Sequence, residues 1–355
     1  MTGRAEPSPT RSETAGLGRR RPAEPDFGVA AWLFVLAAMV FAMAVIGAMT
    51  RLTQSGLSMV EWRPLIGALP PLSQADWQAL FGEYQRSPEY RQLHGWMSLA
   101  DFQGIFWWEY VHRLWGRLIG LAFAGPFVYF LMRGRLPRRL VPGLAGVLAL
   151  GALEGGVGWW MVASGLLDDP HVSHYRLATH LGIAVAIYGA LLWTALGVWE
   201  EPRTAAQHGL LRAAGVALIA LIFLAILSGA LVAGLHAGLV YNSFPLMEGE
   251  VVPRDYLARG RSLDAILSNP AAVQFNHRAL ALISVGAALV FARTVRRRAT
   301  VARPQASMLA AMALLQAGLG VATLLLVVPI PLAALHQAGA LVLFGLAIWV
   351  ARRLG

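Results

Sequence analysis

Long apolar runs separated by short polar segments make up most of this chain. Eight of the runs have the length that a helix needs to cross a hydrocarbon core of about 30 Å, which is roughly 20 residues. They are predicted at 28–50, 105–132, 141–163, 177–199, 212–234, 271–292, 305–328 and 332–351. Pro329 and Pro331 separate the last two runs. The pattern predicts an all-α polytopic membrane protein with eight transmembrane helices.

Two of the polar segments are long, 51–104 and 235–270, and the first contains helix-capping patterns. Ser73 precedes Asp76 by three positions, and Ser98 precedes Asp101 by three. A hydroxyl followed at this spacing by a carboxylate favours the start of a helix. Short interfacial helices are therefore expected in the long segments.

The composition agrees with a membrane protein and limits its chemistry. Of 355 residues, 57% are apolar and only 14% are charged, whereas roughly a quarter of a soluble domain is charged. There is no cysteine, which excludes thiolate-bound iron–sulfur clusters, thioether-attached haem, cysteine zinc sites and disulfides. Any metal or cofactor would be held by His, Met or oxygen ligands.

The distribution of arginine predicts the topology. All 29 basic residues are Arg, and with 19 acidic residues they give a net charge of +10. In a membrane protein this excess indicates topology rather than nucleic-acid binding, because short cytoplasmic segments collect Arg. The termini and the segments after the second, fourth and sixth runs hold 18 Arg, and the opposite segments hold eight. Both termini are thus predicted to be cytoplasmic, with residues 1–27 as a disordered tail.

An internal repeat divides the chain into two halves. Aligned pairs recur in order at offsets that shrink from 182 to 156, as loop shortening within a duplicated unit would produce. The pairs include Gly47 with Gly229, His112-Arg113 with His277-Arg278, Gly158 with Gly320, and His180 with His336. Because four spans return the chain to its starting side, a parallel repeat is expected. We predict two pseudo-symmetric four-helix bundles, at 28–200 and 201–355.

Four of the nine histidines lie near the outer ends of the second, fourth, sixth and eighth runs, at His112, His180, His277 and His336. A single such histidine is more often an interhelical hydrogen-bonding group. Four at matched depth in a repeat favour a shared role as metal ligands, because intramembrane polar groups are costly. Two imidazoles without a carboxylate or thiolate fit axial coordination of haem better than tetrahedral zinc. Two bis-histidine haem centres are predicted.

Charged residues beside these histidines suggest further roles. Arg113 and Arg278 each follow a ligand candidate and are predicted to bind haem propionates, with snorkelling to the interface as the alternative. Glu109 lies three residues before His112, where a carboxylate would either take protons beside the cofactor or act structurally. Its counterpart in the second half is Gln274, which does not titrate. The two centres are therefore expected to do different work.

Other polar positions remain ambiguous. Glu154 in the third run matches Gln316 in the seventh, and the sequence does not separate a packing role from a proton relay. His171 and His174 with residues 168–169 form a possible metal site, although a solvated outer loop is the favoured interpretation.

With these residues in hand, the chain resembles the haem A synthase family over residues 28–351. The stretches that carry the resemblance are 50–71 (TRLTQSGLSMVEWRPLIGALPP), 109–117 (EYVHRLWGR), 176–181 (RLATHL), 229–245 (GALVAGLHAGLVYNSFP), 275–278 (FNHR) and 331–337 (PLAALHQ). The resemblance implies an oxidoreductase that converts haem O to haem A, with a porphyrin methyl group oxidised successively to a formyl group. It implies substrate haem at His112 and His180 with Glu109 beside it, and haem B at His277 and His336.

The resemblance also implies a setting. It places the protein in a bacterial inner membrane, with the haem sites towards the periplasm, a haem O synthase as supplier and terminal oxidase assembly as destination. The cysteine-free sequence resembles the alphaproteobacterial and mitochondrial branch. The electron partner and any homo-oligomer stay open. The main alternative is a non-enzymatic bis-histidine dihaem cytochrome, which leaves Glu109 unexplained; a haem-handling protein is a second.

Overall fold

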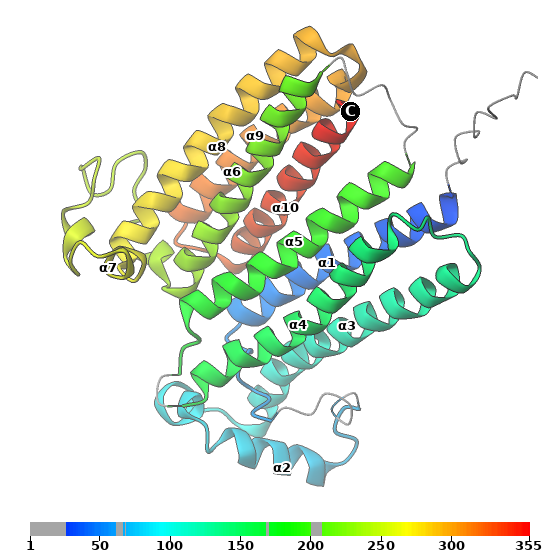
Figure 1. Ribbon diagram of the computed structural model, residues 1–355. Helices are drawn as coiled ribbons and strands as arrows, with labels where there is room; N and C mark the ends of the chain where they lie inside the picture. Colours follow the sequence, from blue (N-terminus) through cyan, green and yellow to red (C-terminus); the bar gives the residue numbers. More distant parts are fainter. Residues whose placement is uncertain (1–25, 62–66, 68, 168–169, 200–207) are drawn as a thin grey trace, which may run out of the picture.

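Eight long helices form one bundle in the computed structural model, which describes residues 26–61, 67, 69–167, 170–199 and 208–355 (Figure 1). They are α1 (Phe27–Leu52), α3 (Leu99–Met132), α4 (Val141–Gly165), α5 (His174–Trp199), α6 (Gly209–Gly234), α8 (Pro270–Arg298), α9 (Arg303–Leu325) and α10 (Ile330–Arg353). Each is long and apolar enough to span a membrane. The described residues contain no β-strand, only an isolated bridge between Met247 and Glu250. The prediction of an all-α polytopic fold with eight spans is confirmed.

Helix ends differ from the apolar runs where capping residues set the boundary. Ser98 caps α3 and Asp101 closes a capping box, so this helix begins six residues before the predicted span. The apolar run 305–328 extends three residues beyond the end of α9 at Leu325. Val327 and Val328 have positive φ angles and turn the chain into α10. Residues 1–25 of the predicted tail lie outside the described residues, and Asp26 caps α1 by accepting from two backbone N–H groups.

The helices of each predicted half pack in the same order. In the first half α1 contacts α3 and α5, and α4 contacts the other faces of both; in the second half α6 contacts α8 and α10, with α9 against both. The pair α3 and α4 packs less extensively than its counterpart, α8 and α9. Helix α5 contacts α6 and α10, and α1 contacts α10, so the halves share one continuous apolar core. The arrangement is what a duplicated four-helix unit would give.

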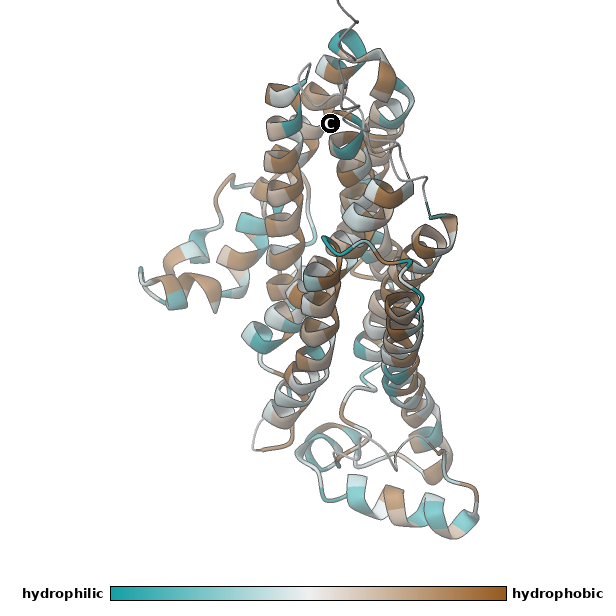
Figure 2. Ribbon diagram, turned by 45° about the vertical axis from the view of Figure 1, so that its right-hand side comes forward, coloured by the Kyte–Doolittle hydropathy of each residue, from teal (hydrophilic) through white to brown (hydrophobic). Residues whose placement is uncertain are grey.

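Short helices lie in the two long segments, as predicted. They are α2 (Gln74–Tyr84), a π-helical turn at Tyr90–His94, 3-10 turns at Ala237–Leu239 and Arg254–Leu257, and α7 (Leu263–Leu267); a further 3-10 turn, Thr300–Ala302, precedes α9. The predicted capping box of Ser73 and Asp76 starts α2. Both α2 and α7 lie at the end of the bundle opposite the C-terminus (Figure 1). Hydrophobic residues line the long helices and hydrophilic ones gather at their ends (Figure 2).

Candidate functional site

The four intramembrane histidines lie near the end of the bundle that carries the long segments, on α3, α5, α8 and α10. The rings of His112 and His180 are 6.5 Å apart between centroids, at an angle of 61°. His277 lies within electrostatic range of His336. The structure thus brings the histidines together in the two pairs that the sequence predicted, one in each half.

A glycine on a neighbouring helix faces each histidine ring. A Cβ atom added to that glycine would lie closer to the ring than ordinary van der Waals contact allows. The separations are 3.1 Å for Gly47 and His112, 3.0 Å for Gly158 and His180, 3.1 Å for Gly229 and His277, and 2.8 Å for Gly320 and His336. Gly47 and Gly229 are repeat partners, as are Gly158 and Gly320. The same two glycine–histidine pairs therefore recur in both halves, and glycine is what makes room for each imidazole.

Three of the four rings have a polar group at Nδ1. The partners are Ser228 Oγ at 2.8 Å from His277, the Gln316 amide at 3.1 Å from His336, and Glu154 Oε1 at 2.9 Å from His180. Within the described part of the chain, no protein group hydrogen-bonds an Nε2 atom of the four rings. A side chain that accepts from Nδ1–H leaves Nε2 free for ligation, as Ser228 and Glu154 can do directly and the Gln316 amide can do when its oxygen faces the ring. This arrangement suits metal ligands.

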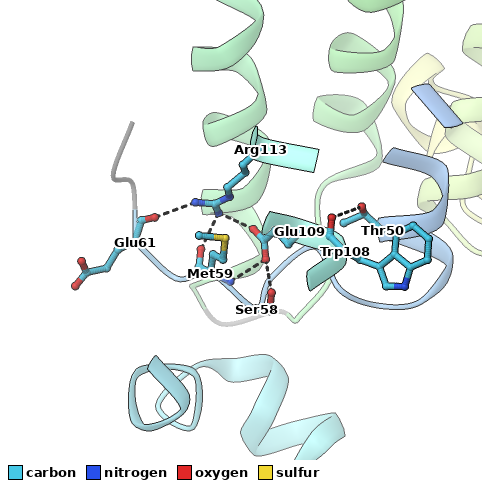
Figure 3. A network of polar contacts seen from close by, with 7 residues as sticks. All are labelled: Thr50, Ser58, Met59, Glu61, Trp108, Glu109 and Arg113. Atoms are coloured by element: carbon cyan, nitrogen blue, oxygen red, sulfur yellow. Dashed lines mark hydrogen bonds and ion pairs between the residues drawn. The ribbon is translucent and has the colours of Figure 1, made fainter. Parts of the chain in front are cut away.

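Glu109 is held in a buried polar network that joins α3 to the first long segment (Figure 3). Its side chain is 2% exposed. Oε2 accepts from Ser58 Oγ at 2.7 Å and from Met59 N at 2.8 Å, and Oε1 accepts from Arg113 Nη2 at 2.6 Å. An ion pair with two further donors stabilises an ionised buried carboxylate. The network fixes Glu109 one helical turn from His112.

Arg113 and Arg278 bind backbone carbonyl groups of the long segments, a role that the sequence analysis missed. Arg113 donates to the carbonyls of Met59 at 2.7 Å and Glu61 at 3.0 Å. Arg278 donates to those of residues 241 and 243, at 2.7 Å and 2.8 Å. The residues whose carbonyls accept these bonds are repeat partners at the offset of 182, since 59 corresponds to 241 and 61 to 243. Each arginine therefore anchors the same point of the segment that follows α1 or α6, and the propionate role stays a prediction.

A second buried polar cluster lies in the first long segment and was also missed. Tyr84 Oη donates to Glu89 Oε2 at 3.0 Å and lies 2.7 Å from His94 Nδ1. His94 Nε2 lies 3.3 Å from Gln54 Oε1. Burial raises the pKa of Glu89 to about 8, partly offset by the bond from Tyr84. Tyr84, Glu89 and His94 lie within eleven residues of one another, but their spacing of five follows no helical or strand period, and Gln54 is 40 residues away.

The outer histidines do not assemble a larger cluster. The rings of His171 and His236 are 5.6 Å apart, and His174 begins α5 against Gly234. Residues 168–169, named with His171 and His174 as a possible metal site, lie outside the described residues. In the described ranges, no three His, Asp or Glu side chains gather as a metal site.

The donor set fits haem iron. Each half offers two imidazoles, and each ring is accommodated by a glycine on the neighbouring helix. Two imidazoles without a thiolate match axial haem ligation rather than structural zinc. Fold and site together define a multi-pass helical membrane protein with a pair of histidines within the helices of each half.

Comparison with known proteins gives the family. The model of the COX15-CtaA family, described as cytochrome oxidase assembly protein, matches residues 30–348, and the chain belongs to this family. A heme A synthase of Nitrosospira multiformis is 50% identical over 328 residues, covering 91% of this chain and 92% of the relative. That of Rhodospirillum centenum is 51% identical over 341 residues, covering 95% and 91%. That of Paramagnetospirillum magneticum is 47% identical over 333 residues, covering 92% and 94%. The resemblance to haem A synthases is confirmed.

Proposed function

We propose that this protein is a membrane oxidoreductase that converts haem O into haem A by oxidising a porphyrin methyl group to a formyl group. The observation that carries the proposal is a duplicated pair of histidine sites with a buried carboxylate, Glu109, beside only one of them. Relatives with about half of their residues identical over most of this chain carry the name heme A synthase. A protein that only carries electrons would not need this asymmetry.

In this proposal the two halves hold different haems. His112 and His180 hold the substrate haem in residues 28–200, and His277 and His336 hold haem B in residues 201–355. The looser packing of α3 against α4 supports this assignment, because a substrate must enter and leave while a cofactor stays. Haem B supplies one-electron transfer within the membrane. Arg113 and Arg278, which anchor the outer segments, would be the cationic groups available to the haem propionates.

Glu109 serves as the proton acceptor of the first half. Conversion of a methyl to a formyl group with water as the oxygen donor releases four protons, which need an acceptor near the reacting carbon, and four electrons, which a separate redox partner must accept. The carboxylate is positioned for this role by its 2.6 Å ion pair with Arg113, which holds it beside His112. The Ser58 hydroxyl, 2.7 Å from Oε2, connects it to the outer segment. Gln274, at the same place in the second half, donates to the Tyr241 carbonyl and takes no proton.

The same proposal includes an orientation and partners. Both termini face the cytoplasm, and the histidines lie towards the periplasm of a bacterial inner membrane. Arginines 296–298 at the end of α8 and 352–353 at the end of α10 support this orientation. A haem O synthase supplies the substrate, and assembly of the terminal oxidase uses the product.

Acid extraction of haems from the detergent-purified protein, followed by chromatography against haems B, O and A, tests the proposal. We expect haem B together with haem O or A. His112→Ala should lose haem O and A but keep haem B, and His277→Ala should do the reverse. Haem B alone in both halves would support the electron-transfer alternative, and release of unaltered haem would support a handling protein.

A further inference from the structure

The Nδ1 atoms of His180 and His336 face side chains that differ in charge. In the first half, Glu154 Oε1 of α4 lies 2.9 Å from His180 Nδ1. In the second half, the Gln316 amide of α9 lies 3.1 Å from His336 Nδ1 and also donates to the His336 carbonyl at 2.9 Å. Glu154 and Gln316 are repeat partners at an offset of 162. The two contacts therefore occupy the same position in both halves, with a carboxylate in one and an amide in the other.

The surroundings of Glu154 leave its oxygens without donors. Its side chain is 14% exposed, and among the described residues neither oxygen finds a hydrogen bond of suitable geometry; the same holds for His180 Nδ1. A carboxylate within a membrane span is costly unless it finds a donor. The nearest donor is the Nδ1–H of His180, and turning the ring towards the carboxylate satisfies both groups. The position is thus suited to a carboxylate–histidine pair.

Ligation through Nε2 gives this pair a consequence for the iron. An imidazole that binds iron through Nε2 carries its proton on Nδ1. A carboxylate accepts from that Nδ1–H more strongly than a neutral group does, and so raises the basicity of the ligand. A more basic ligand favours ferric over ferrous iron. An amide is uncharged whichever of its two ends faces Nδ1, and its effect is smaller.

We propose that Glu154 is a positioning residue that makes His180 a strongly electron-donating ligand, so that the first-half iron is more easily oxidised than it would be beside an amide. The inference rests on the haem ligation of the proposed function. It is separate from the role of Glu109, whose oxygens are bound by Ser58, Met59 and Arg113. One position of a duplicated unit then sets different reduction potentials in the two halves.

Reciprocal exchange tests the proposal. Glu154→Gln places an amide in both halves, and Gln316→Glu places a carboxylate in both. Potentiometric titration of the visible haem bands of the purified holoprotein gives the two midpoint potentials. His277→Ala, which removes the second-half ligand, assigns each potential to its half. The ferric electron paramagnetic resonance spectrum gives a second readout that does not depend on turnover.

We expect Glu154→Gln to raise the first-half potential and leave the second unchanged. We expect a change in the ferric to ferrous ratio of about tenfold, which corresponds to about 59 mV for one electron. Gln316→Glu should lower the second-half potential alone. Unchanged potentials in both variants, with haem content retained, would overturn the role of Glu154 and leave the proposed function intact. If Glu154→Gln does not fold, Gln316→Glu tests the proposal alone: a lowered second-half potential supports it, and an unchanged potential with haem retained overturns it. Wild-type protein containing haem B alone would instead refute the proposed function.

Discussion

The contact between Gly320 and His336 allows a sharp test of the ligand assignment in the second half. A Cβ at residue 320 would lie 2.8 Å from His336 Cε1, whereas ordinary contacts begin at 3.4 Å. Gly320→Ala therefore requires the ring to move by about 0.6 Å. Overpacking of this kind costs about 1–3 kcal/mol, which corresponds to a loss in haem affinity of roughly 5- to 150-fold.

Gly318→Ala is the matched control, because a Cβ at residue 318 meets no atom within 4 Å. Both variants exchange glycine for alanine within α9 and gain similar helix stability, up to about 1 kcal/mol. The difference between them therefore measures the contact with the histidine ring. The assay is haem B content per protein, with the reduced-minus-oxidised spectrum as a measure of bis-imidazole ligation. Full haem content and an unchanged spectrum in Gly320→Ala would show that His336 is not a ligand in this position.

Three further predictions concern the polar networks. Glu109→Gln should abolish haem A formation while the protein still binds haem, measured by extraction from cells that supply haem O; full haem A production would leave Glu109 a structural role only. Burial raises the pKa of Glu89 from 4.5 to about 8. Between pH 4.5 and pH 8 the folded protein therefore holds a proton that the unfolded chain has lost. The free energy of unfolding then falls as the pH rises through this range, by at most about 1.4 kcal/mol per pH unit. An infrared carboxyl band that disappears near pH 8 and is absent from Glu89→Gln checks this; disappearance near pH 4.5 would contradict it. Arg278→Met removes two charged hydrogen bonds to the 241–243 segment, worth about 1.5–3 kcal/mol each, and should speed its proteolysis by at least about tenfold, because about 1.4 kcal/mol is a factor of ten; an unchanged cleavage rate would show that other contacts hold the segment.

The sequence predicted those features that depend on periodicity and composition. Eight spans follow from apolar length, and the capping boxes at Ser73 and Ser98 follow from local spacing. The four histidines could be paired because helices that run in the same direction place equal sequence depths at equal heights. The repeat also singled out Gly47 and Gly158, although their purpose became visible only when each was seen against a ring.

Contacts between distant segments could not be predicted in the same way. The carbonyl groups that bind Arg113 belong to residues 59 and 61, and a carbonyl leaves no mark in a sequence. The cluster of Tyr84, Glu89 and His94 depends on how the outer segment folds back on itself. The choice between packing and proton relay for Glu154 needed the 2.9 Å separation from His180.

The two halves agree in geometry and differ in charge at two matched positions. At each position the first half has a carboxylate and the second half has an amide: Glu109 corresponds to Gln274, and Glu154 corresponds to Gln316. These exchanges keep side-chain shape nearly constant, so the ligands and their glycines need not move. Glu109 is neutralised by Arg113, whereas in the described part of the chain Glu154 has an ion-pair contact with His180 alone. The difference in charge felt by the iron therefore arises mainly at Glu154, while Glu109 differs from its counterpart chiefly in its ability to take a proton. In the function proposed above, one exchange would adjust the metal and the other the proton chemistry, so that a duplicated bundle could hold a reacting haem and an electron-transfer haem in the same frame.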